Sequence, residues 1–204
     1  MRKIVKRFYY SIMKTLFSRI FETRFTAAPV TFKTFFFQKI LGFNRKVYWP
    51  THFTSQVKNY KNIVIGVGTA PGLSPGCLIQ GGGKIEIGDY TIIAPNVGII
   101  SSNHDLLDNR KYLKSKVNIG KYCWIGMNST VLPGTELGDF TIVGAGSVVT
   151  KSFKDGYCII GGTPAKIIKK LNKKDCVHYE NDFKYNGYIK ADKFQNYKEK
   201  HLNE

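Results

Sequence analysis

The stretch IGKYCWIGMNSTVLPGTELGDFTIVGAGSVVTKSFK, residues 119–154, decides the fold of this chain. An aliphatic residue recurs at every sixth position, and four positions after each comes a residue that is small in five cases of six. The aliphatic residues are Ile119, Ile125, Val131, Leu137, Val143 and Val149, and the residues that follow them are Cys123, Ser129, Thr135, Thr141, Ser147 and Phe153. This period fits neither an α-helix nor a simple amphipathic strand. It is typical of a solenoid of short parallel strands.

The alternation of side chains along a strand explains the pattern. Neighbouring residues point to opposite faces, so the aliphatic residue and the small residue two positions before it both point inward, and the residue between them points outward. Three such hexads complete one triangular coil, with Gly, Asn or Asp supplying tight turns at the corners. We therefore predict an all-β solenoid, whose handedness the spacing alone does not set.

The repeat also organises the rest of the 204 residues. We expect a basic aromatic segment at 1–60, the solenoid at 61–163 and a basic tail with a short helix at 164–204. The Gly- and Pro-rich run at 63–83 predicts an irregular first coil. Within the solenoid, the polar insertion at 105–116 replaces the hexads and predicts an extruded loop. A short helix followed by an edge strand is our expectation for residues 25–60.

The formal charge of +17 is carried mainly by the two ends of the chain. Residues 1–48 hold a net +10, residues 49–165 a net +3 and residues 166–204 a net +4. The basic excess therefore concerns partners or ligand phosphates rather than the fold. No nucleic-acid-binding module is recognisable, so nucleic acid is not an expected partner.

The four cysteines show neither a CxxC pair nor a disulfide-like spacing, which favours reduced thiols in a cytoplasmic protein. No apolar run reaches the roughly 18 residues that span a membrane, and no cleavable signal is evident. Residues 3–24 form apolar pairs every four residues with Lys and Arg between them, which predicts an amphipathic helix. Such a helix can lie on an anionic membrane at the inner face. Its apolar stripe drifts by roughly 160° over the segment, however, which favours packing against the solenoid, a partner subunit or another amphipathic segment.

His104 is the candidate for catalysis that the spacing singles out. It is the only histidine inside the repeat region, at the base of the polar insertion. Extending the lattice from Ile99 makes Asn103 an inward residue and His104 an outward one. An imidazole on the outer face beside a loop can take a proton near neutral pH. An exposed histidine without a role fits the same spacing.

Several ordered motifs resemble one known family. They are IIAPNV at 92–97, SSNHD at 101–105, WIG at 124–126, GAGSVVTK at 144–151 and GGTPAK at 161–166. Together they look like the hexapeptide-repeat acetyltransferases, near the galactoside and maltose acetyltransferases and the O-acetyltransferases of polysaccharide clusters. The resemblance covers about residues 63–171.

The resemblance implies a left-handed parallel β-helix, a homotrimer, and acetyl-CoA bound between adjacent prisms as acyl donor, with no metal. By similarity, His104 would deprotonate an acceptor hydroxyl that attacks the thioester directly, with Asn103 and Asp105 on the acceptor side. Asp105 would project away from the ring and is a poor candidate for orienting it. On the donor side, the similarity assigns Trp124 to the pantetheine channel, Ala145, Thr150 and Lys151 to the turn that meets CoA, and Lys166 and Lys169 to the nucleotide phosphates. For Trp124 a surface or trimer contact, and for the two lysines a solvated basic face, are the alternatives.

The acceptor is less defined than the reaction. The family residues that hold the sugar fall on Ser74 and Gly82 in this sequence, so that geometry is not carried over. We expect a sugar, nucleotide-sugar or lipid-linked glycan acceptor. The alternatives are serine O-acetylation, amino-sugar N-acetylation, antibiotic acetylation, and a non-enzymatic scaffold. A zinc carbonic anhydrase on the same solenoid would need three imidazoles, and the repeat supplies one.

Overall fold

The structure of the protein, a computed structural model, describes residues 17–203. Most of the amphipathic helix predicted at 3–24 lies outside these residues, and within them α2 spans Ser18–Thr23. No helix in the described part of the chain is both long enough and apolar enough to cross a membrane.

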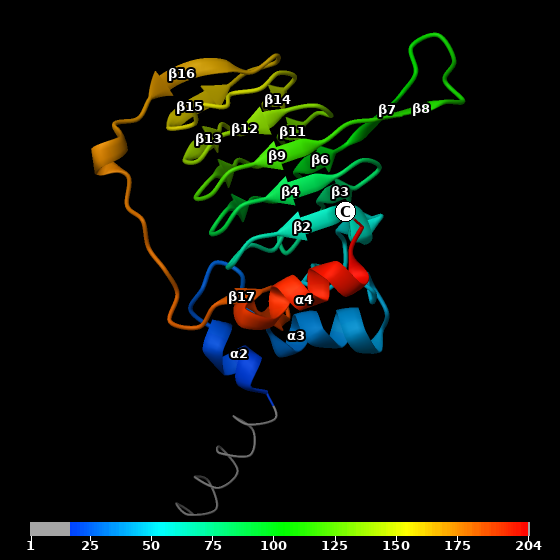
Figure 1. Cartoon of the computed structure of the whole chain (residues 1–204), viewed down its shortest axis with the longest axis vertical. Helices are drawn as coiled ribbons and strands as arrows, with labels where there is room; N and C mark the ends of the chain where they lie inside the picture. Colours follow the sequence, from blue (N-terminus) through cyan, green and yellow to red (C-terminus); the bar gives the residue numbers. More distant parts are fainter. Residues whose placement is uncertain (1–16, 204) are drawn as a thin grey trace, which may run out of the picture.

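Three parallel sheets form the faces of a triangular coil (Figure 1). Sheet A consists of β1 (Gln56–Lys58), β3 (Leu78–Gln80), β6 (Gly98–Ile100), β11 (Thr130–Val131) and β14 (Val148–Val149). Sheet B consists of β2 (Ile63–Ile65), β4 (Ile85–Ile87), β9 (Val117–Ile119) and β12 (Glu136–Leu137). Sheet C consists of β5 (Ile92–Ile93), β10 (Trp124–Ile125), β13 (Thr141–Val143), β15 (Cys158–Gly161) and the antiparallel β16 (Lys166–Lys170).

The chain visits sheets A, B and C in turn, and each visit takes one hexad. Thr130 pairs with Val148 in sheet A, and Trp124 pairs with Ile142 in sheet C, so one coil is 18 residues long. The solenoid of parallel strands predicted from the sequence is thus confirmed. The first coil is irregular, as expected, because β2 and β3 are separated by turns at 66–77.

The residues that the hexad pattern predicts to point inward form the core of the solenoid. All six aliphatic residues of the 119–154 stretch are at most 3% exposed, and the five small residues at most 2%. The hydroxyls among them donate to corner carbonyls, as Ser129 Oγ does to Gly144 O at 2.9 Å and Thr141 Oγ1 to Gly138 O at 2.6 Å. A hydroxyl therefore fits this interior because it satisfies a carbonyl that the turn leaves unpaired.

One corner of the prism carries an aromatic ladder, defined here as Tyr90, Tyr122, Phe140 and Tyr157. All four have positive φ, between 46° and 56°, which is uncommon for bulky residues. Their rings stack in sequence, with centroids 5.3, 4.9 and 5.2 Å apart. Stacking between successive coils offsets the backbone cost of these turns.

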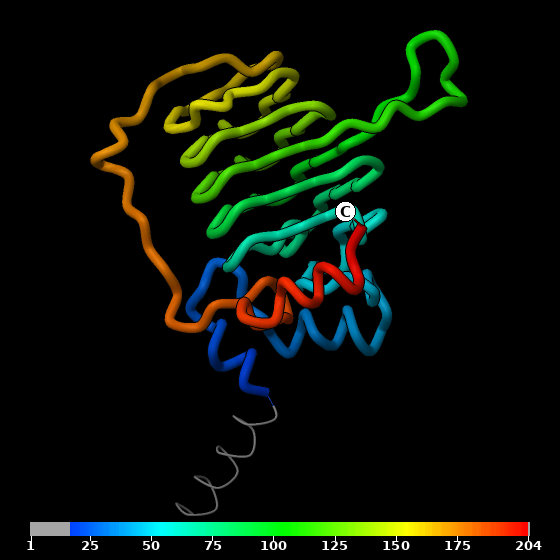
Figure 2. The backbone as a smooth tube through the Cα atoms, in the orientation of Figure 1, coloured from blue at the N-terminus to red at the C-terminus, as the bar shows by residue number. Residues whose placement is uncertain are grey.

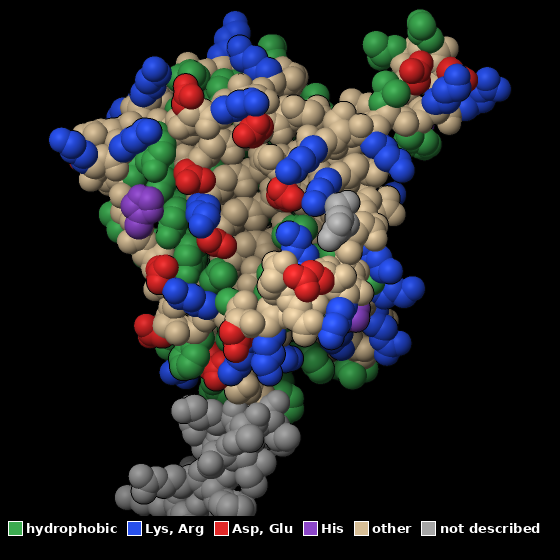
Figure 3. Space-filling model, in the orientation of Figure 1, with side chains coloured by type: hydrophobic (Ala, Val, Ile, Leu, Met, Phe, Trp, Pro, Cys, Tyr) green, Lys and Arg blue, Asp and Glu red, His purple; other side chains and the backbone are tan. Residues whose placement is uncertain are grey.

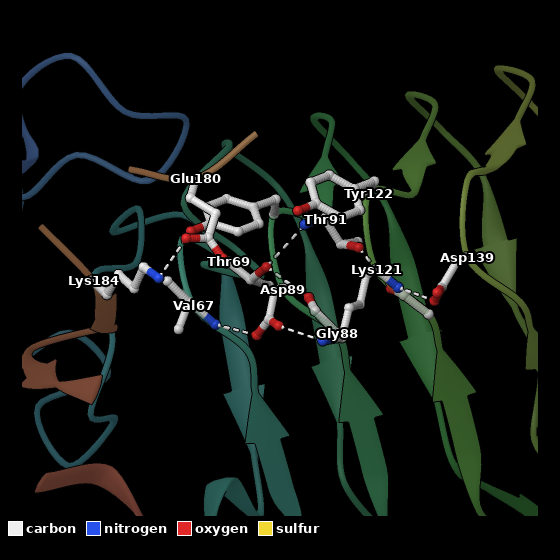
Figure 4. A network of polar contacts seen from close by, with 12 residues as sticks. Val67, Thr69, Gly88, Asp89, Thr91, Lys121, Tyr122, Asp139, Glu180 and Lys184 are labelled. Carbon is white, nitrogen blue, oxygen red and sulfur yellow. Dashed lines mark hydrogen bonds and ion pairs between the residues drawn. The ribbon is translucent and has the colours of Figure 1, made fainter. Parts of the chain in front are cut away.

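Carboxylates tie the coils together beside this ladder (Figure 4). Asp89 Oδ1 accepts from the backbone N–H of Val67 at 2.8 Å, and Asp139 Oδ1 accepts from that of Lys121 at 2.7 Å. Lys121 Nζ in turn lies 2.9 Å from Asp89 Oδ2. Each Asp after a corner Gly thus bonds to the neighbouring coil.

Elements from both ends of the chain cover the first coil (Figure 2). They are α3 (Phe32–Phe35), the π-helix η1 (Phe36–Ile40), the 3-10 helix η2 (Tyr60–Asn62), the hairpin of β17 (Tyr185–Asn186) and β18 (Ile189–Lys190), and α4 (Ala191–His201). Trp49 is fully buried beneath them and donates its indole N–H to Pro71 O at 2.7 Å. A strap, residues 171–184, containing the 3-10 helix η3 (Lys173–Asp175), runs back along the solenoid from the last coil to the first. The short helix and edge strand expected at 25–60 correspond to α3–η1 and β1.

The cysteines give a direct test of the packing. Cys77, Cys123 and Cys158 are buried free thiols, and burial raises the pKa of each, that of Cys123 to about 12. Cys176, on the strap, is only partly covered. Because the thiolate is the reactive form, we expect one fast-reacting thiol per native chain in a titration with Ellman's reagent, and four after unfolding. Cys176→Ser should remove the fast phase. Two or more fast thiols in that variant would contradict the packed solenoid.

Candidate active site

The predicted extruded loop is an antiparallel hairpin that leaves the solenoid at the edge between sheets A and B (Figure 1). It consists of β7 (Ser102–His104) and β8 (Tyr112–Lys114), with His104 opposite Tyr112. At its base, Ser101 still belongs to the coil, since its N–H donates to Gln80 O at 3.1 Å. The insertion is therefore an ordered arm rather than an irregular loop.

The expected inward position of Asn103 is wrong. Ser101 and Ser102 are buried, whereas Asn103 and His104 are both exposed. The hexad lattice ends at Ser101, because the chain pairs with β8 from Ser102 onward and leaves the prism. From Asn103 onward both faces of β7 meet solvent. His104 is exposed as expected, but on the hairpin arm rather than on the outer face of the prism.

The His104 ring is held by the turn of its own hairpin. Nδ1 lies 2.5 Å from the backbone carbonyl oxygen of Asn109, and the ring packs against Tyr112 with centroids 4.3 Å apart. A carbonyl can only accept, so Nδ1 carries the proton and the neutral ring presents the lone pair of Nε2. The arrangement gives an exposed imidazole with one nitrogen ready to take a proton.

Asp105 shapes the turn that supplies this carbonyl. Its Oδ1 accepts from the N–H groups of Leu107 at 2.8 Å and Asp108 at 3.0 Å, and its own N–H donates to Lys111 O at 2.9 Å. Asp108 lies beside the Arg110 guanidinium at 2.8 Å, which lowers the pKa of its carboxyl. The carboxylate of Asp105 is thus engaged by backbone, in agreement with its being a poor partner for the His104 ring.

Sequence reasoning missed Asn109 and Tyr112 as partners of His104. Asn109 contributes a main-chain carbonyl, which any residue provides, so no side-chain pattern signals it. Tyr112 meets the ring through the cross-strand register of the hairpin. That register could be assigned only once the structure had shown that the insertion forms a pair of antiparallel strands.

Part of the predicted donor site lies along sheet C. Trp124 is 53% exposed on β10, between the paired residues Ile92 and Ile142. The register continues through Ile159 to Lys169, so Trp124 and Lys169 share the outer face of the sheet. They are separated by three strand spacings, or about 14 Å.

Ala145 and Lys166 lie at the edge where sheet C turns into sheet A. Ala145 is exposed in the turn between β13 and β14, and the next residue, Gly146, donates its N–H to Met127 O at 2.8 Å. Lys166 begins β16 opposite Gly161 and is exposed. These two residues continue the surface of Trp124 and Lys169.

Thr150 and Lys151 lie at a different edge. They follow β14 in the turn from sheet A to sheet B, the same edge at which the His104 hairpin leaves the coil. A pocket of about 690 Å³ at the last coil includes Lys151, Lys154, Lys170 and Lys173 but not His104. Within this chain, the predicted donor residues therefore occupy two edges of the prism and do not form a single cleft.

The two positions that depart from the family pattern have structural roles here. Ser74 Oγ donates to Ile93 O at 2.7 Å, so its hydroxyl is engaged within the coil. Gly82 lies against the hairpin base, where a Cβ would come 2.1 Å from Ser102 Oγ. A side chain at Gly82 would therefore displace the hairpin.

The described residues contain no group of three or more His, Cys, Asp or Glu arranged to hold a metal ion.

Comparison with known proteins agrees with the fold. Residues 116–151 match the family model described as "Bacterial transferase hexapeptide (six repeats)". Galactoside O-acetyltransferase of Escherichia coli (strain K12) is 34% identical over 109 residues, which cover 52% of this chain and 53% of the relative. From the same strain, "Putative lipopolysaccharide biosynthesis O-acetyl transferase WbbJ" is 42% identical over 102 residues, covering 44% of this chain and 52% of the relative. The chain thus matches about half the length of these curated relatives.

Solved structures show the same architecture. A maltose O-acetyltransferase from Clostridium difficile 630 has a TM-score of 0.54 at 34% identity, over 58% of this chain and 64% of that one. A hexapeptide-repeat acetyltransferase from Vibrio cholerae, solved with acetyl coenzyme A, has a TM-score of 0.52 at 21% identity, over 79% of this chain and 90% of that one. The second likeness bears on the fold alone. The resemblance to hexapeptide-repeat acetyltransferases predicted from the sequence is confirmed.

Proposed function

We propose that this hexapeptide-repeat protein is an acetyl-CoA-dependent O-acetyltransferase that acts on a hydroxyl of a sugar or glycan intermediate. The observation that carries the proposal is the exposed His104 ring, whose Nδ1 is bonded to the Asn109 carbonyl and whose Nε2 has no hydrogen-bond partner among residues 17–203. A hydroxyl with an ordinary, high pKa needs such a base at the moment of attack. The similarity in sequence and fold to sugar O-acetyltransferases supports the same chemistry.

In the proposed reaction, Nε2 of His104 takes the proton of the acceptor hydroxyl as its oxygen attacks the thioester carbonyl carbon. The tetrahedral adduct collapses by breaking the C–S bond, and the imidazolium returns the proton to the leaving thiolate. The products are an acetyl ester and free CoA, so no acyl-enzyme forms. During proton uptake, the carbonyl of Asn109 keeps the ring in one orientation and stabilises the imidazolium.

The division of the donor residues between two edges supports a homotrimer. His104, Thr150 and Lys151 lie at the edge between sheets A and B, whereas Trp124 and Ala145 lie on sheet C and its edge with sheet A. A groove between two prisms brings the two edges together. The hairpin tip also exposes Leu106 and Leu107, each at 98%, as expected for a tip that contacts a neighbouring protomer. By similarity to the family, we infer that this β-helix is left-handed.

The acceptor is inferred from the relatives. The names of the matched proteins concern galactosides, maltose and lipopolysaccharide biosynthesis, which favours an intermediate of polysaccharide assembly over serine, an amino sugar or an antibiotic. We infer action in the cytoplasm, with contact at the inner membrane face when the acceptor is lipid-linked.

The direct test is an acceptor screen. The protein is incubated with acetyl-CoA and with free sugars, nucleotide sugars, glycolipids or serine, and CoA release is followed before the product is identified by mass. An O-acetylated sugar is the expected product. Acetylated serine or an amide product would replace the proposed acceptor class. Absence of both CoA release and CoA-induced thermal stabilisation would favour the scaffold reading.

The donor site is tested by reversing charge at the two β16 lysines. Both ammonium groups are exposed, and each is proposed to meet a phosphate of CoA. Loss of a charge-assisted hydrogen bond weakens binding by about tenfold or more. The Lys166→Glu and Lys169→Glu variants should therefore raise the KM for acetyl-CoA by roughly that factor and leave the KM for the acceptor nearly unchanged.

A matched control is Lys200→Glu, an equivalent change at an exposed residue of α4, which should alter neither KM. Equal increases in both KM values on reversal at 166 or 169 would point to a structural role for β16.

A further inference from the structure

The helix formed by α3 and η1, residues 32–40, has its polarity inverted. Phe32, Phe36 and Ile40 follow one another at intervals of four residues and are 50%, 48% and 60% exposed. Gln38, on the opposite side, is fully buried. A surface helix of a folded domain normally presents polar residues to water and apolar ones to the core. This helix instead exposes an apolar side and buries the amide of Gln38.

The orientation of the helix is fixed by Gln38. Its Nε2 donates to Val47 O at 3.2 Å and Trp49 O at 2.9 Å, and its Oε1 accepts from the N–H of Thr51 at 3.2 Å and the hydroxyl of Tyr188 at 2.7 Å. Rolling the helix to bury its phenylalanines would leave these buried polar groups unpaired. The apolar side is therefore held outward by the structure.

The outward side continues into a larger surface, the aromatic face, which consists of Phe32, Phe35, Phe36, Ile40, Leu41 and Phe43. Leu41 is 52% exposed and Phe43 46% exposed, and the Phe43 ring packs beside Phe37 and Phe53. A contiguous apolar face of this kind marks a place where something apolar binds.

The basic side chains around the aromatic face indicate what kind of surface it binds. Residues 17–60 hold seven Lys and Arg against a single acid, Glu22, and the carboxylate of Glu22 accepts a hydrogen bond from Tyr185. Lys33, Arg45 and Lys46 are exposed within or beside the face. Basic side chains crowd one side of this helical end of the molecule (Figure 3). An apolar surface with a basic surround is complementary to anionic lipid, because the rings enter the acyl boundary while the cations meet phosphates.

We propose that the aromatic face docks on an anionic lipid bilayer, with Phe32, Phe36 and Ile40 entering the acyl boundary and Lys33, Arg45 and Lys46 against the headgroup phosphates. This surface adjoins the end of the amphipathic segment predicted at 3–24, since the Phe32 ring lies 5.1 Å from that of Phe17. It is independent of the proposed acetyl transfer. It lies at the first-coil end of the solenoid, away from the His104 hairpin (Figure 1). The hairpin would therefore stand off the membrane, at a height where a lipid-linked glycan extends.

The test is co-sedimentation of the full chain with vesicles of phosphatidylcholine, with and without phosphatidylglycerol. The parent protein should sediment with the anionic vesicles. Replacing two large apolar side chains in the Phe36→Ser, Ile40→Ser double variant should lower the partition coefficient by about tenfold or more. Lys33→Glu and Lys46→Glu should each lower it by about fivefold on anionic vesicles. Val177→Ser, at a 73% exposed apolar residue of the strap, should leave it unchanged.

Light scattering and thermal unfolding of every variant confirm that fold and oligomer are intact. Sedimentation of the double variant equal to that of the parent would overturn the proposal and place any membrane contact elsewhere, as would a parent that ignores anionic vesicles. Dissociation of the oligomer in the double variant would also overturn it, because the aromatic face would then be an interface between copies of this chain.

Discussion

Replacing His104 with alanine is expected to lower kcat by roughly 10²- to 10⁴-fold, the usual contribution of a positioned general base. The substitution removes the only nitrogen proposed to accept the acceptor proton. Because the ring is exposed and its contacts in the described part of the chain are with Asn109 and Tyr112 of the same hairpin, the solenoid should fold as before. Steady-state kinetics, CoA binding and thermal unfolding measured on one preparation separate these effects.

Two matched variants sharpen the test. His178→Ala removes an exposed imidazole that lies edge-on to the aromatic ladder, 4.9 Å from Phe140, and should keep near-normal turnover. Asn109→Ala should also stay active, since the residue holds His104 through its main-chain carbonyl. Near-normal turnover of His104→Ala would remove the imidazole from the mechanism. A large loss in Asn109→Ala would show that the amide side chain, rather than the carbonyl, takes part.

The core of the solenoid was predictable because its rule is local. A strand alternates its side chains whatever surrounds it, so the hexad spacing assigned Ser129, Val131 and their equivalents to the interior, and all are buried. The same rule failed at Asn103, because the hexad lattice had already ended at Ser101. An argument from spacing holds only while the chain follows the hexad repeat. No signal in the sequence marks the residue at which a strand begins to pair outside the solenoid.

The corners were understood less well, because their constraint acts between coils. Glycine was expected there to supply tight turns, yet Gly88, Gly120 and Gly138 do not have positive φ; the aromatic residues Tyr90, Tyr122 and Phe140, two positions later, do. These glycines are needed because the next coil passes too close for a Cβ. A signal for the ladder did exist, in the tyrosines that recur after Gly88 and Gly120, but stacking could be read only once the coils were placed.

The inverted helix at 32–40 illustrates the opposite difficulty. Phe35, Phe36 and Phe37 in succession suggest a buried segment, since aromatic residues usually lie inside. Only the hydrogen bonds of the Gln38 side chain show that the polar residue takes the interior and the rings face outward. A long-range polar anchor of this kind leaves no periodic trace in the sequence.

The second large effect is expected from a single methyl group at Gly138. A Cβ there would lie 2.2 Å from Lys154 O and 2.6 Å from the backbone nitrogen of Gly156, both in the next coil. Gly138 also donates its N–H to Phe153 O at 3.0 Å and accepts from Thr141 Oγ1 at 2.6 Å. Relieving the overlap must separate the coils and weaken the bond from Gly138 to Phe153, which joins them. Overpacking of this kind costs about 2–3 kcal/mol.

Gly98 provides the matched control, because the same substitution there meets nothing closer than Thr130 at 3.5 Å. In thermal unfolding at one fixed protein concentration, Gly138→Ala should lower Tm by about 5–10 °C, whereas Gly98→Ala should stay within about 2 °C of the parent. Equal Tm values for the two variants would mean that the successive coils are packed less closely at Gly138 than the structure shows. Since the corner that Gly138 keeps close also aligns Asp139 with Lys121 of the coil before, a shift there should also disturb the stacking of Tyr122 on Phe140 in the aromatic ladder.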